Sequence, residues 1–236
     1  MKTGYPIDVL VLCGGLGTRL RSVIGENQKV LASVDHKPFL ELLLRYIQKQ
    51  KIKRVILCAG YQADALAKIL SDAKLTLDIV ISKEEKPLGT GGAVKNAFEH
   101  IRSDPFFVVN GDSFCRIDYK AVQDFHVAKK AGVTVVLSMT GDGKDFGTVD
   151  LDAACRVTAF REKVKSGHGT VNVGIYCCQK KILNFMPPGN AFSMEREVFP
   201  QLVGHDFYGF VTDEPFIDIG TPERYQKAQS LRIFDP

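Results

Sequence analysis

The chain has 236 residues, of which 45% are hydrophobic and 25% charged, with 31 Lys and Arg against 27 Asp and Glu. This composition is that of an ordinary globular protein and excludes collagen, low-complexity disorder and a coiled coil. The formal charge of +4 favours an anionic ligand but is too small and too scattered to predict nucleic-acid binding.

The sequence gives no sign of a membrane or secretory protein. No apolar run approaches the roughly 20 residues of a membrane span, and the N-terminus does not resemble a signal peptide. The six cysteines include no C-x-x-C spacing, which argues against zinc and thioredoxin chemistry. We therefore expect a reduced, cytoplasmic protein that does not bind a membrane.

In the first half of the chain, apolar strands alternate with helices. Short branched runs predict strands at 7–13, 54–59, 77–81 and 106–109, and helical spacing predicts helices at 38–47, at 64–70 and from after Gly92 to about Ile101. This alternation predicts an α/β, Rossmann-like fold with a mixed, mainly parallel sheet and helices on both faces. Ligands of such sheets bind beyond the carboxyl ends of the strands. Here those ends are Cys13-Gly14, Ala59-Gly60 and Asn110-Gly111-Asp112.

The second half is richer in short strands. The pattern predicts helices at 118–131, 191–202 and 222–231, and strands at 133–139, 148–151, 156–161 and 171–177. The shorter strands are expected to form a small antiparallel extension at one end of the main sheet. Because no linker or repeat interrupts the sequence, we expect a single domain over 1–236, with an α/β half (about 1–115) and a β-rich half (about 116–236).

A glycine-rich turn follows the first strand directly. Gly14, Gly15 and Gly17 allow successive N–H groups to converge on one spot, which is a geometry that binds phosphate. Thr18 adds a hydroxyl donor, and Arg19 can clamp phosphate oxygens. The alternative is an ordinary strand-terminating turn with a surface arginine.

Two other phosphate motifs are excluded. The dinucleotide fingerprint G-x-G-x-x-G requires a small residue where this chain has Leu20, and no Gly-Lys-Ser/Thr of a P-loop occurs. A nicotinamide-dependent dehydrogenase is therefore disfavoured.

Several segments in order along the chain resemble the sugar-1-phosphate nucleotidyltransferases. They are Gly14-Gly15-Leu16-Gly17-Thr18-Arg19-Leu20, Gln28-Lys29-Val30-Leu31, Lys37-Pro38-Phe39-Leu40, Pro87–Ala93, Val109–Asp112, Phe160–Lys163, Val171–Tyr176 and Phe216–Pro222. Two departures concern one loop: Gln28 stands where the family usually has proline, and Arg21-Ser22-Val23 replaces proline-leucine-threonine. They leave the path of that loop open.

Within the family, the short chain and its Phe192-Ser193-Met194-Glu195 segment are most similar to the D-glycero-α-D-manno-heptose-1-phosphate guanylyltransferases. The mannose-1-phosphate guanylyltransferases come second. The resemblance implies transfer of GMP from GTP to a sugar 1-phosphate, with Mg²⁺ and release of pyrophosphate, for the synthesis of surface polysaccharide. The first half would bind the nucleotide and the second the sugar phosphate.

The resemblance also implies roles for individual residues. The catalytic cations would be Arg19 and Lys29, and the metal ligands Asp112 and Asp218, which both sit among bulky apolar residues where a carboxylate needs a counter-ion. The nucleotide would contact Gly14, Gly15, Gly17, Thr18, Gly89 and Thr90. The sugar phosphate would contact Gly147, Glu162, Lys163 and Asn172. An acceptor for guanine could come from Glu84 or Glu85.

Two alternatives stay open at this point: another base or sugar in the same enzyme class, and a catalytically silent regulatory or binding subunit on the same fold. The sequence does not fix the oligomeric state, so a homo-oligomer stays open as well. Retention of Arg19, Lys29, Asp112 and Asp218 argues against the silent subunit.

Overall fold

A computed structural model of the chain describes residues 5–15, 18–25, 28–60, 66, 70–140, 147–161 and 169–230. At its centre lies a sheet of nine strands. They are β1 (Tyr5–Leu12), β4 (Ile52–Ala59), β5 (Asp78–Lys83), β6 (Phe106–Asn110), β8 (Val133–Thr140), β9 (Thr148–Leu151), β10 (Val157–Arg161), β11 (Gly169–Cys178) and β12 (Phe207–Thr212).

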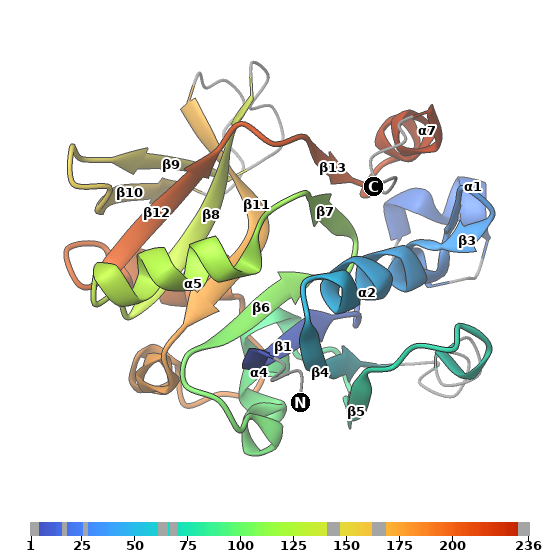
Figure 1. Ribbon diagram of the computed structural model, residues 1–236, viewed down its shortest axis with the longest axis horizontal. Helices are drawn as coiled ribbons and strands as arrows, with labels where there is room; N and C mark the ends of the chain where they lie inside the picture. The colour runs from blue at the N-terminus through green and yellow to red at the C-terminus, as the bar shows by residue number, and fades with distance from the viewer. Residues whose placement is uncertain are drawn as a thin grey trace.

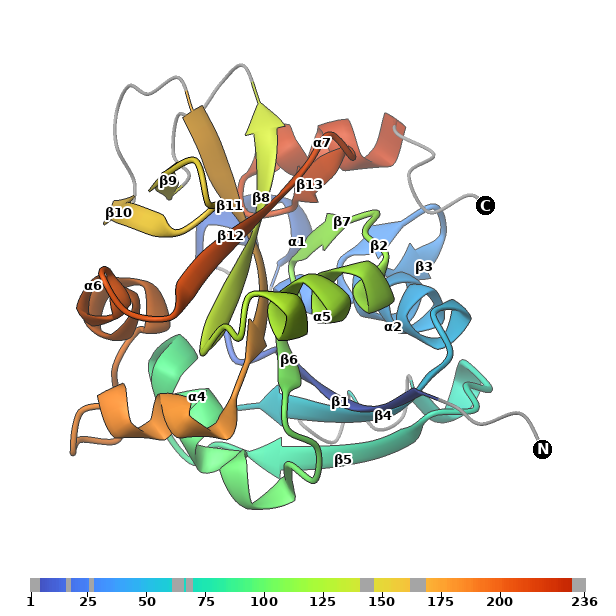
Figure 2. The ribbon, with the colours of Figure 1, turned by 60° about the vertical axis from the view of Figure 1, so that its left-hand side comes forward.

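The strands follow the order β10-β9-β11-β6-β1-β4-β5, with β8 pairing both β11 and β12 (Figures 1 and 2). Strands β1, β4, β5 and β6 are parallel to one another, whereas β11 is antiparallel to β6. The predicted Rossmann-like mixed sheet is confirmed. The predicted antiparallel extension belongs to the same sheet, because β6 joins the two halves of the chain.

Helices cover both faces of the sheet (Figures 1 and 2). One face carries α2 (Phe39–Lys49) and α5 (Tyr119–Ala128), and the other carries α4 (Gly89–Asn96) and α6 (Phe199–Leu202). The remaining helical segments are α1 (Arg21–Ile24), α7 (Pro222–Ser230), the 3-10 turns η1 (Thr18–Leu20), η2 (Lys29–Leu31), η3 (Phe98–His100) and η4 (Lys180–Phe185), and the π-helical turn η5 (Met194–Val198). None of the helices in these described ranges is long and apolar enough to cross a membrane.

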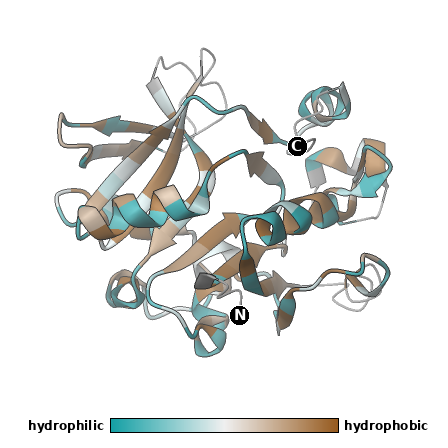
Figure 3. Cartoon of the chain, in the orientation of Figure 1, coloured by the Kyte–Doolittle hydropathy of each residue, from teal (hydrophilic) through white to brown (hydrophobic). Residues whose placement is uncertain are grey.

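The central strands are apolar on both sides, as the sequence predicts (Figure 3). In β1, Val9 and Val11 enter the core beneath α2, whereas Leu10 between them enters the core beneath α4. In β6, Phe107 enters the core beneath α2 and Phe106 the core beneath α4. This alternation follows from the two-residue period of a strand and explains why these runs read as continuous apolar sequence.

The predicted helix over 191–202 is wrong in its first part. Helical structure begins only after Ser193, whose hydroxyl accepts a hydrogen bond from the Arg196 N–H at 3.3 Å. The backbone of Phe192 is held elsewhere, because its carbonyl accepts from the Gly91 N–H at 3.0 Å in α4. Most of the predicted helix at 64–70 lies outside the described residues.

Short strands that the pattern did not predict complete the structure. They are β12, the hairpin-like pair β2 (Ser33–Val34) and β3 (Lys37–Pro38), and the pair β7 (Ser113–Cys115) and β13 (Phe216–Asp218). The β7–β13 pair is antiparallel and sets Asp218 opposite Ser113. It therefore carries a segment from the end of the chain to the end of β6.

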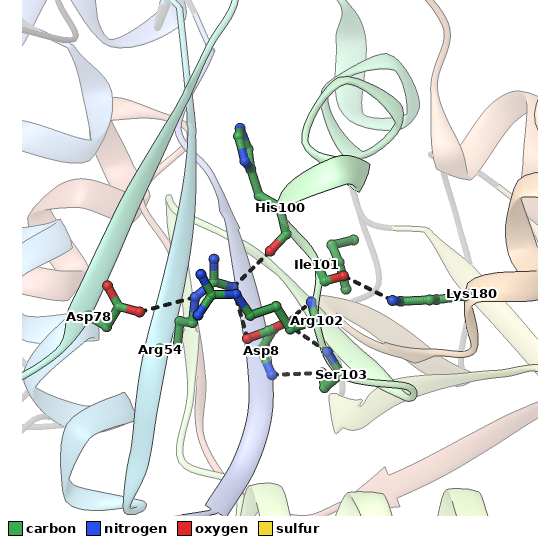
Figure 4. Close-up of polar contacts among 8 residues, drawn as sticks. All are labelled: Asp8, Arg54, Asp78, His100, Ile101, Arg102, Ser103 and Lys180. Carbon is green, nitrogen blue, oxygen red and sulfur yellow. Dashed lines mark hydrogen bonds and ion pairs between the residues drawn. The ribbon is translucent and has the colours of Figure 1, made fainter.

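A buried ion-pair network ties together the opposite end of the sheet (Figure 4). Asp8 on β1 is 4% exposed, and its carboxylate accepts hydrogen bonds from Arg54 on β4 at 3.1 Å and from the backbone N–H groups of Arg102 and Ser103. Arg54 also contacts Asp78 of β5 at 3.1 Å. Since a buried carboxylate needs such partners, the network fixes β1, β4 and the segment before β6.

Candidate functional site

The carboxyl ends of β1, β5 and β6 surround a cavity of about 430 Å³, here called the first cavity. Gly14 and Gly15 follow β1, Glu84 follows β5, and Asp112 follows β6. Lys29 from η2 reaches the same space. The crevice expected beyond the strand ends is therefore present, and it brings together glycines, a cation and two carboxylates.

A second cavity of about 360 Å³ adjoins the first. The two share Gly89, Thr90 and Asn110 in their walls. The other predicted residues lining the second cavity are Arg19, Gly147, Asn172 and Asp218. A ligand in one cavity therefore meets a ligand in the other beside Asn110 and the first turn of α4.

Most of the predicted site residues line one of these two cavities. Gly14, Gly15, Lys29 and Asp112 line the first, Arg19, Gly147, Asn172 and Asp218 the second, and Gly89 and Thr90 both. Gly17, Glu162 and Lys163 lie outside the described residues, as does the side chain of Thr18.

The two predicted metal ligands lie close to one ammonium group. Lys29 is 8% exposed and donates a hydrogen bond to Asp112 Oδ2. The N–H of Ile219 donates to the carbonyl of Asp112 at 3.0 Å, which holds the neighbouring Asp218 beside it. A Cβ atom on Gly220 would lie 2.6 Å from Asp218 Oδ1 and 3.2 Å from Lys29 Nζ. Lys29 is therefore near both carboxylates.

Asp218 has a cation of its own. Its Oδ1 accepts hydrogen bonds from Arg224 at 3.0 Å and from the Gly220 N–H at 2.7 Å. Arg224 lies in α7 and also lines the second cavity. The site thus pairs two carboxylates with two cations before any ligand is considered.

Glu84 lines the first cavity. Its Oε2 accepts the Leu88 N–H at 3.3 Å, whereas its buried Oε1 has no hydrogen-bond partner in the described part of the chain. Desolvation raises the pKa of this carboxyl group. A Cβ atom on Gly14 would lie 3.0 Å from Oε1, so the open acceptor is next to the glycine turn.

The first turn of α4 requires glycine at position 89. Gly89 has φ +69°, and a Cβ atom there would lie 2.6 Å from the Phe192 carbonyl oxygen. Both the left-handed backbone and the close approach exclude a larger residue. The segment around Phe192 thereby fixes where the first turn of α4 faces the cavities.

A buried carboxylate organises the wall of the second cavity. Glu195 is 9% exposed and accepts hydrogen bonds from Thr90 at 2.6 Å, Ser193 at 2.8 Å and Tyr176 at 3.1 Å. Because the Glu195 carboxylate can only accept, the hydroxyls of Thr90, Ser193 and Tyr176 are the donors to it. The Tyr176 hydroxyl in turn accepts from the Asn172 side-chain amide at 2.8 Å.

Asn110 lies where the two cavities meet. Its Oδ1 is buried and has no hydrogen-bond partner among the residues described. Gly174 has φ +78°, and a Cβ atom there would lie 2.4 Å from Asn110 Nδ2. A side chain at 174 would therefore displace the Asn110 amide from the shared wall.

A thiol nucleophile is not available at this site. Cys13 follows β1, between Leu12 and Gly14 of the first cavity, and burial raises the pKa of its thiol, with Asp112 and Glu84 raising it further. All six cysteines are free, and five of them are buried. The chemistry of the site is therefore that of carboxylates, cations and backbone N–H groups.

Sequence reasoning gave no role to several residues that line the second cavity, among them Tyr176, Glu195, Arg196 and Arg224. The signal that could have found Glu195 is its place two residues after the helix-capping Ser193. Arg224 follows the Gly220-Thr221-Pro222 turn, where a helix start faces the site. Neither signal names a ligand without the fold.

Known proteins are similar to this chain over nearly its whole length. The family model described as "Nucleotidyl transferase" matches residues 8–232. The D-glycero-alpha-D-manno-heptose 1-phosphate guanylyltransferase of Aneurinibacillus thermoaerophilus is 37% identical over 224 residues, which are 94% of this chain and 97% of that protein. The mannose-1-phosphate guanylyltransferase of Mycobacterium tuberculosis is 36% identical over 231 residues, covering 96% of this chain and 64% of that protein.

A solved structure is similar over nearly the same length. HddC from Yersinia pseudotuberculosis matches with a TM-score of 0.86 at 37% identity, covering 95% of this chain and 98% of that one. Its complex with GMP-PN matches with a TM-score of 0.85 at the same identity.

Proposed function

The chain belongs to the nucleotidyl transferase family, and we propose that it transfers GMP from GTP to D-glycero-α-D-manno-heptose 1-phosphate, releasing pyrophosphate. The observation that carries this proposal is the shared wall of the two cavities at Gly89, Thr90 and Asn110. Two substrates placed in them would meet beside Lys29 and the two aspartates.

The reaction brings two anions together. A phosphate oxygen of the sugar 1-phosphate attacks the α-phosphorus of GTP, the new P–O bond forms, and the bond from the α-phosphorus to the bridging oxygen breaks as pyrophosphate leaves. The nucleophile is already ionised, so no general base is needed. The protein has to position the two phosphates and offset their charge.

The cations at the cavities fit that need. Lys29 in the first cavity would contact the α-phosphate, and Arg19 in the second would hold phosphate oxygens beside it. The glycine turn at Gly14 and Gly15 would face the triphosphate with backbone N–H groups. Gly147 and Asn172 would contact the sugar phosphate, and we propose the same role for Glu162 and Lys163.

Asp112 and Asp218 fit a divalent cation such as Mg²⁺. Both supply carboxylate oxygens, which are ligands that Mg²⁺ prefers, and the hydrogen bond from the Ile219 N–H to the Asp112 carbonyl brings their segments together. No group of three metal-binding side chains occurs in the described ranges, which suits an ion that takes few protein ligands and keeps its waters. Bound there, Mg²⁺ would offset charge on the reacting phosphates.

Glu84 supports guanine as the base. Guanine presents two donors, N1–H and the exocyclic amine, on one edge, and a carboxylate is the acceptor that can meet both. Glu84 has a buried Oε1 without a partner in the first cavity. The neighbouring Glu85 does not line the cavity, so Glu84 is the better candidate of the two.

The second candidate function keeps the chemistry and changes the acceptor to mannose 1-phosphate, because a mannose-1-phosphate guanylyltransferase is nearly as similar to this chain. The nucleotide sugar formed would serve the synthesis of surface polysaccharide. Six free cysteines suit a reducing compartment, and we place the enzyme in the cytoplasm.

A matrix of nucleoside triphosphates against sugar 1-phosphates tests the proposal, with Mg²⁺ present and pyrophosphate release measured. We expect turnover to be highest with GTP and the heptose 1-phosphate. A maximum with mannose 1-phosphate would select the second candidate, and no pyrophosphate from any pair would refute the enzyme.

A further inference from the structure

Lys29 contacts one of the two aspartates and lies near the other. Its ammonium contacts Asp112 Oδ2 and lies 3.2 Å from the point where a Cβ atom on Gly220 would be, with Asp218 Oδ1 2.6 Å from that same point. The lysine is 8% exposed and the Asp112 side chain 30%, so this contact is partly shielded from water. Shielded ion pairs are less screened than those on a surface.

The fold forces the two carboxylates together independently of Lys29. Strand β13 pairs with β7 so that Asp218 lies opposite Ser113, and the Ile219 N–H donates to the Asp112 carbonyl at 3.0 Å. Two neighbouring carboxylates repel each other. Arg224 pairs with one carboxylate and Lys29 with the other, which leaves the group of four balanced in charge.

A divalent cation that binds Asp112 would compete with the ammonium for the same oxygen. We propose that Lys29 is the built-in counter-ion of Asp112 and Asp218 in the substrate-free protein, and that a divalent cation has to displace it to bind. This inference rests on the metal site of the proposed function and adds an order of events to it. A cation arriving with GTP releases Lys29 beside the phosphates, where the lysine finds a new anionic partner.

The consequence is antagonism between the lysine and the cation in the absence of substrate. The cation alone binds weakly because it must separate an existing ion pair. Removing the ammonium leaves two carboxylates without that partner, so the cation should then bind more tightly. A lysine that served only the phosphates would leave the affinity of the free protein for the cation unchanged.

The test measures Mn²⁺ binding to the full, substrate-free chain by electron paramagnetic resonance. We expect Lys29→Met and Lys29→Gln to bind Mn²⁺ about ten-fold more tightly than the unmodified protein. Lys29→Arg retains the charge and should show no such gain. The matched control is Lys120→Met, which removes an exposed lysine paired with Asp124 on α5 and should leave Mn²⁺ binding unchanged.

A second measurement guards against loss of folding. Melting temperatures of each variant are compared in EDTA and in MgCl₂, and the gain on adding MgCl₂ should be larger for Lys29→Gln than for the unmodified protein. The double variant Lys29→Gln with Asp112→Asn should lose that extra gain. Equal responses of Lys29→Gln and the unmodified protein, including no response in either, would overturn the proposal.

This outcome is separable from that of the proposed function. If pyrophosphate release requires Mg²⁺ but the variants bind Mn²⁺ no better, the displacement inference fails while the enzyme stands. If no substrate pair releases pyrophosphate but the variants gain affinity, the enzyme fails while the counter-ion role of Lys29 stands.

Discussion

Thr90 donates a hydrogen bond of 2.6 Å to Glu195, a residue 105 positions later in the sequence. Thr90 lies in the first turn of α4 and borders both cavities, whereas Glu195 lies in the wall of the second. The same carboxylate accepts from Tyr176, which holds Asn172. The wall of the second cavity is therefore built on a segment that also lines the first.

Replacing Glu195 by glutamine tests this arrangement. Glutamine keeps the shape but turns one acceptor into a donor, so at least one of the hydroxyls of Thr90, Ser193 and Tyr176 must rotate away. We expect KM for the sugar 1-phosphate to rise about ten-fold, and more than KM for GTP. Glu197→Gln, an exposed neighbour in the same turn, should leave both unchanged. Equal kinetics in the two variants would contradict the role of Glu195.

Replacing Glu84 by glutamine should change the choice of base. The glutamine amide offers one acceptor and one donor, which cannot meet both donors on the guanine edge. We expect kcat/KM for GTP to fall about 100-fold, because a buried polar group is left unpaired. Uracil pairs one donor with one acceptor, so the ratio of UTP to GTP turnover should rise. An unchanged ratio would show that Glu84 does not read the base.

Arg19→Ala and Asp112→Asn should remove turnover without unfolding the protein. Each removes a charge from the cavities, and we expect kcat to fall about 100-fold or more. Circular dichroism and melting curves would establish that the fold is intact. If both variants stay fully active, the assignment of the site is wrong.

Asp8 and Asp78 should contribute unequally to stability although both contact Arg54. Asp8→Ala leaves the buried Arg54 without its main partner, and we expect the free energy of unfolding to fall by about 3 kcal/mol. Asp78 is 59% exposed in its side chain, so Asp78→Asn should cost less than about 1 kcal/mol. Urea denaturation measures both. Turnover per folded molecule should not change, since this network lies at the amino ends of β1 and β4.

His126 should make the fold sensitive to acid. The side chain is 1% exposed, and burial lowers its pKa to about 4, with nearby Lys181 lowering it and Asp104 opposing the shift. The unfolded chain therefore takes up a proton near pH 6.5 that the folded protein takes up only near pH 4. Stability from this group is complete above about pH 6.5 and falls between pH 6.5 and 4, by about 2 kcal/mol at pH 5.

His126→Asn should flatten that dependence. Asparagine retains a polar group near Thr134, which His126 Nδ1 contacts at 2.9 Å, but it does not titrate. Free energies of unfolding at pH 5 and pH 7 would be compared in both proteins. The same difference in the variant as in the unmodified protein would assign the acid sensitivity to another group.

The parts of the fold that could be predicted are those with a local cause. The strand at Phe106–Asn110 begins with four consecutive apolar residues, which pack alternately into the two cores. Such an uninterrupted apolar run predicts a strand that is buried on both faces. Strand β12 was missed because Gly209 interrupts its apolar pattern and its pairing with β8 comes from residues more than 70 positions away. The start of η5 depends on Phe192 contacting α4, which is also a distant contact.

The residues of the site differ in the same way: some have a local signal in the sequence, and others depend on distant contacts. Residues at strand ends and in glycine turns, such as Gly14, Lys29 and Asp112, have recognisable neighbours in the sequence. Glu195 stands in a segment that resembles the family, but its role depends on Thr90 and Tyr176, which lie 105 and 19 positions away. That Asp112 and Asp218 come close could be expected only from the resemblance, since the β7–β13 pair that joins them is two short strands.

The continuity of the central sheet limits how the enzyme can move. Strands β6 and β11 are paired from Val109 and Ile175 to Phe106 and Cys178, so the two halves of the chain share a ladder of main-chain hydrogen bonds. A clam-shell motion that opened one half against the other would break that ladder. Substrates must therefore be admitted and products released by rearrangement of side chains and connecting segments around a rigid platform.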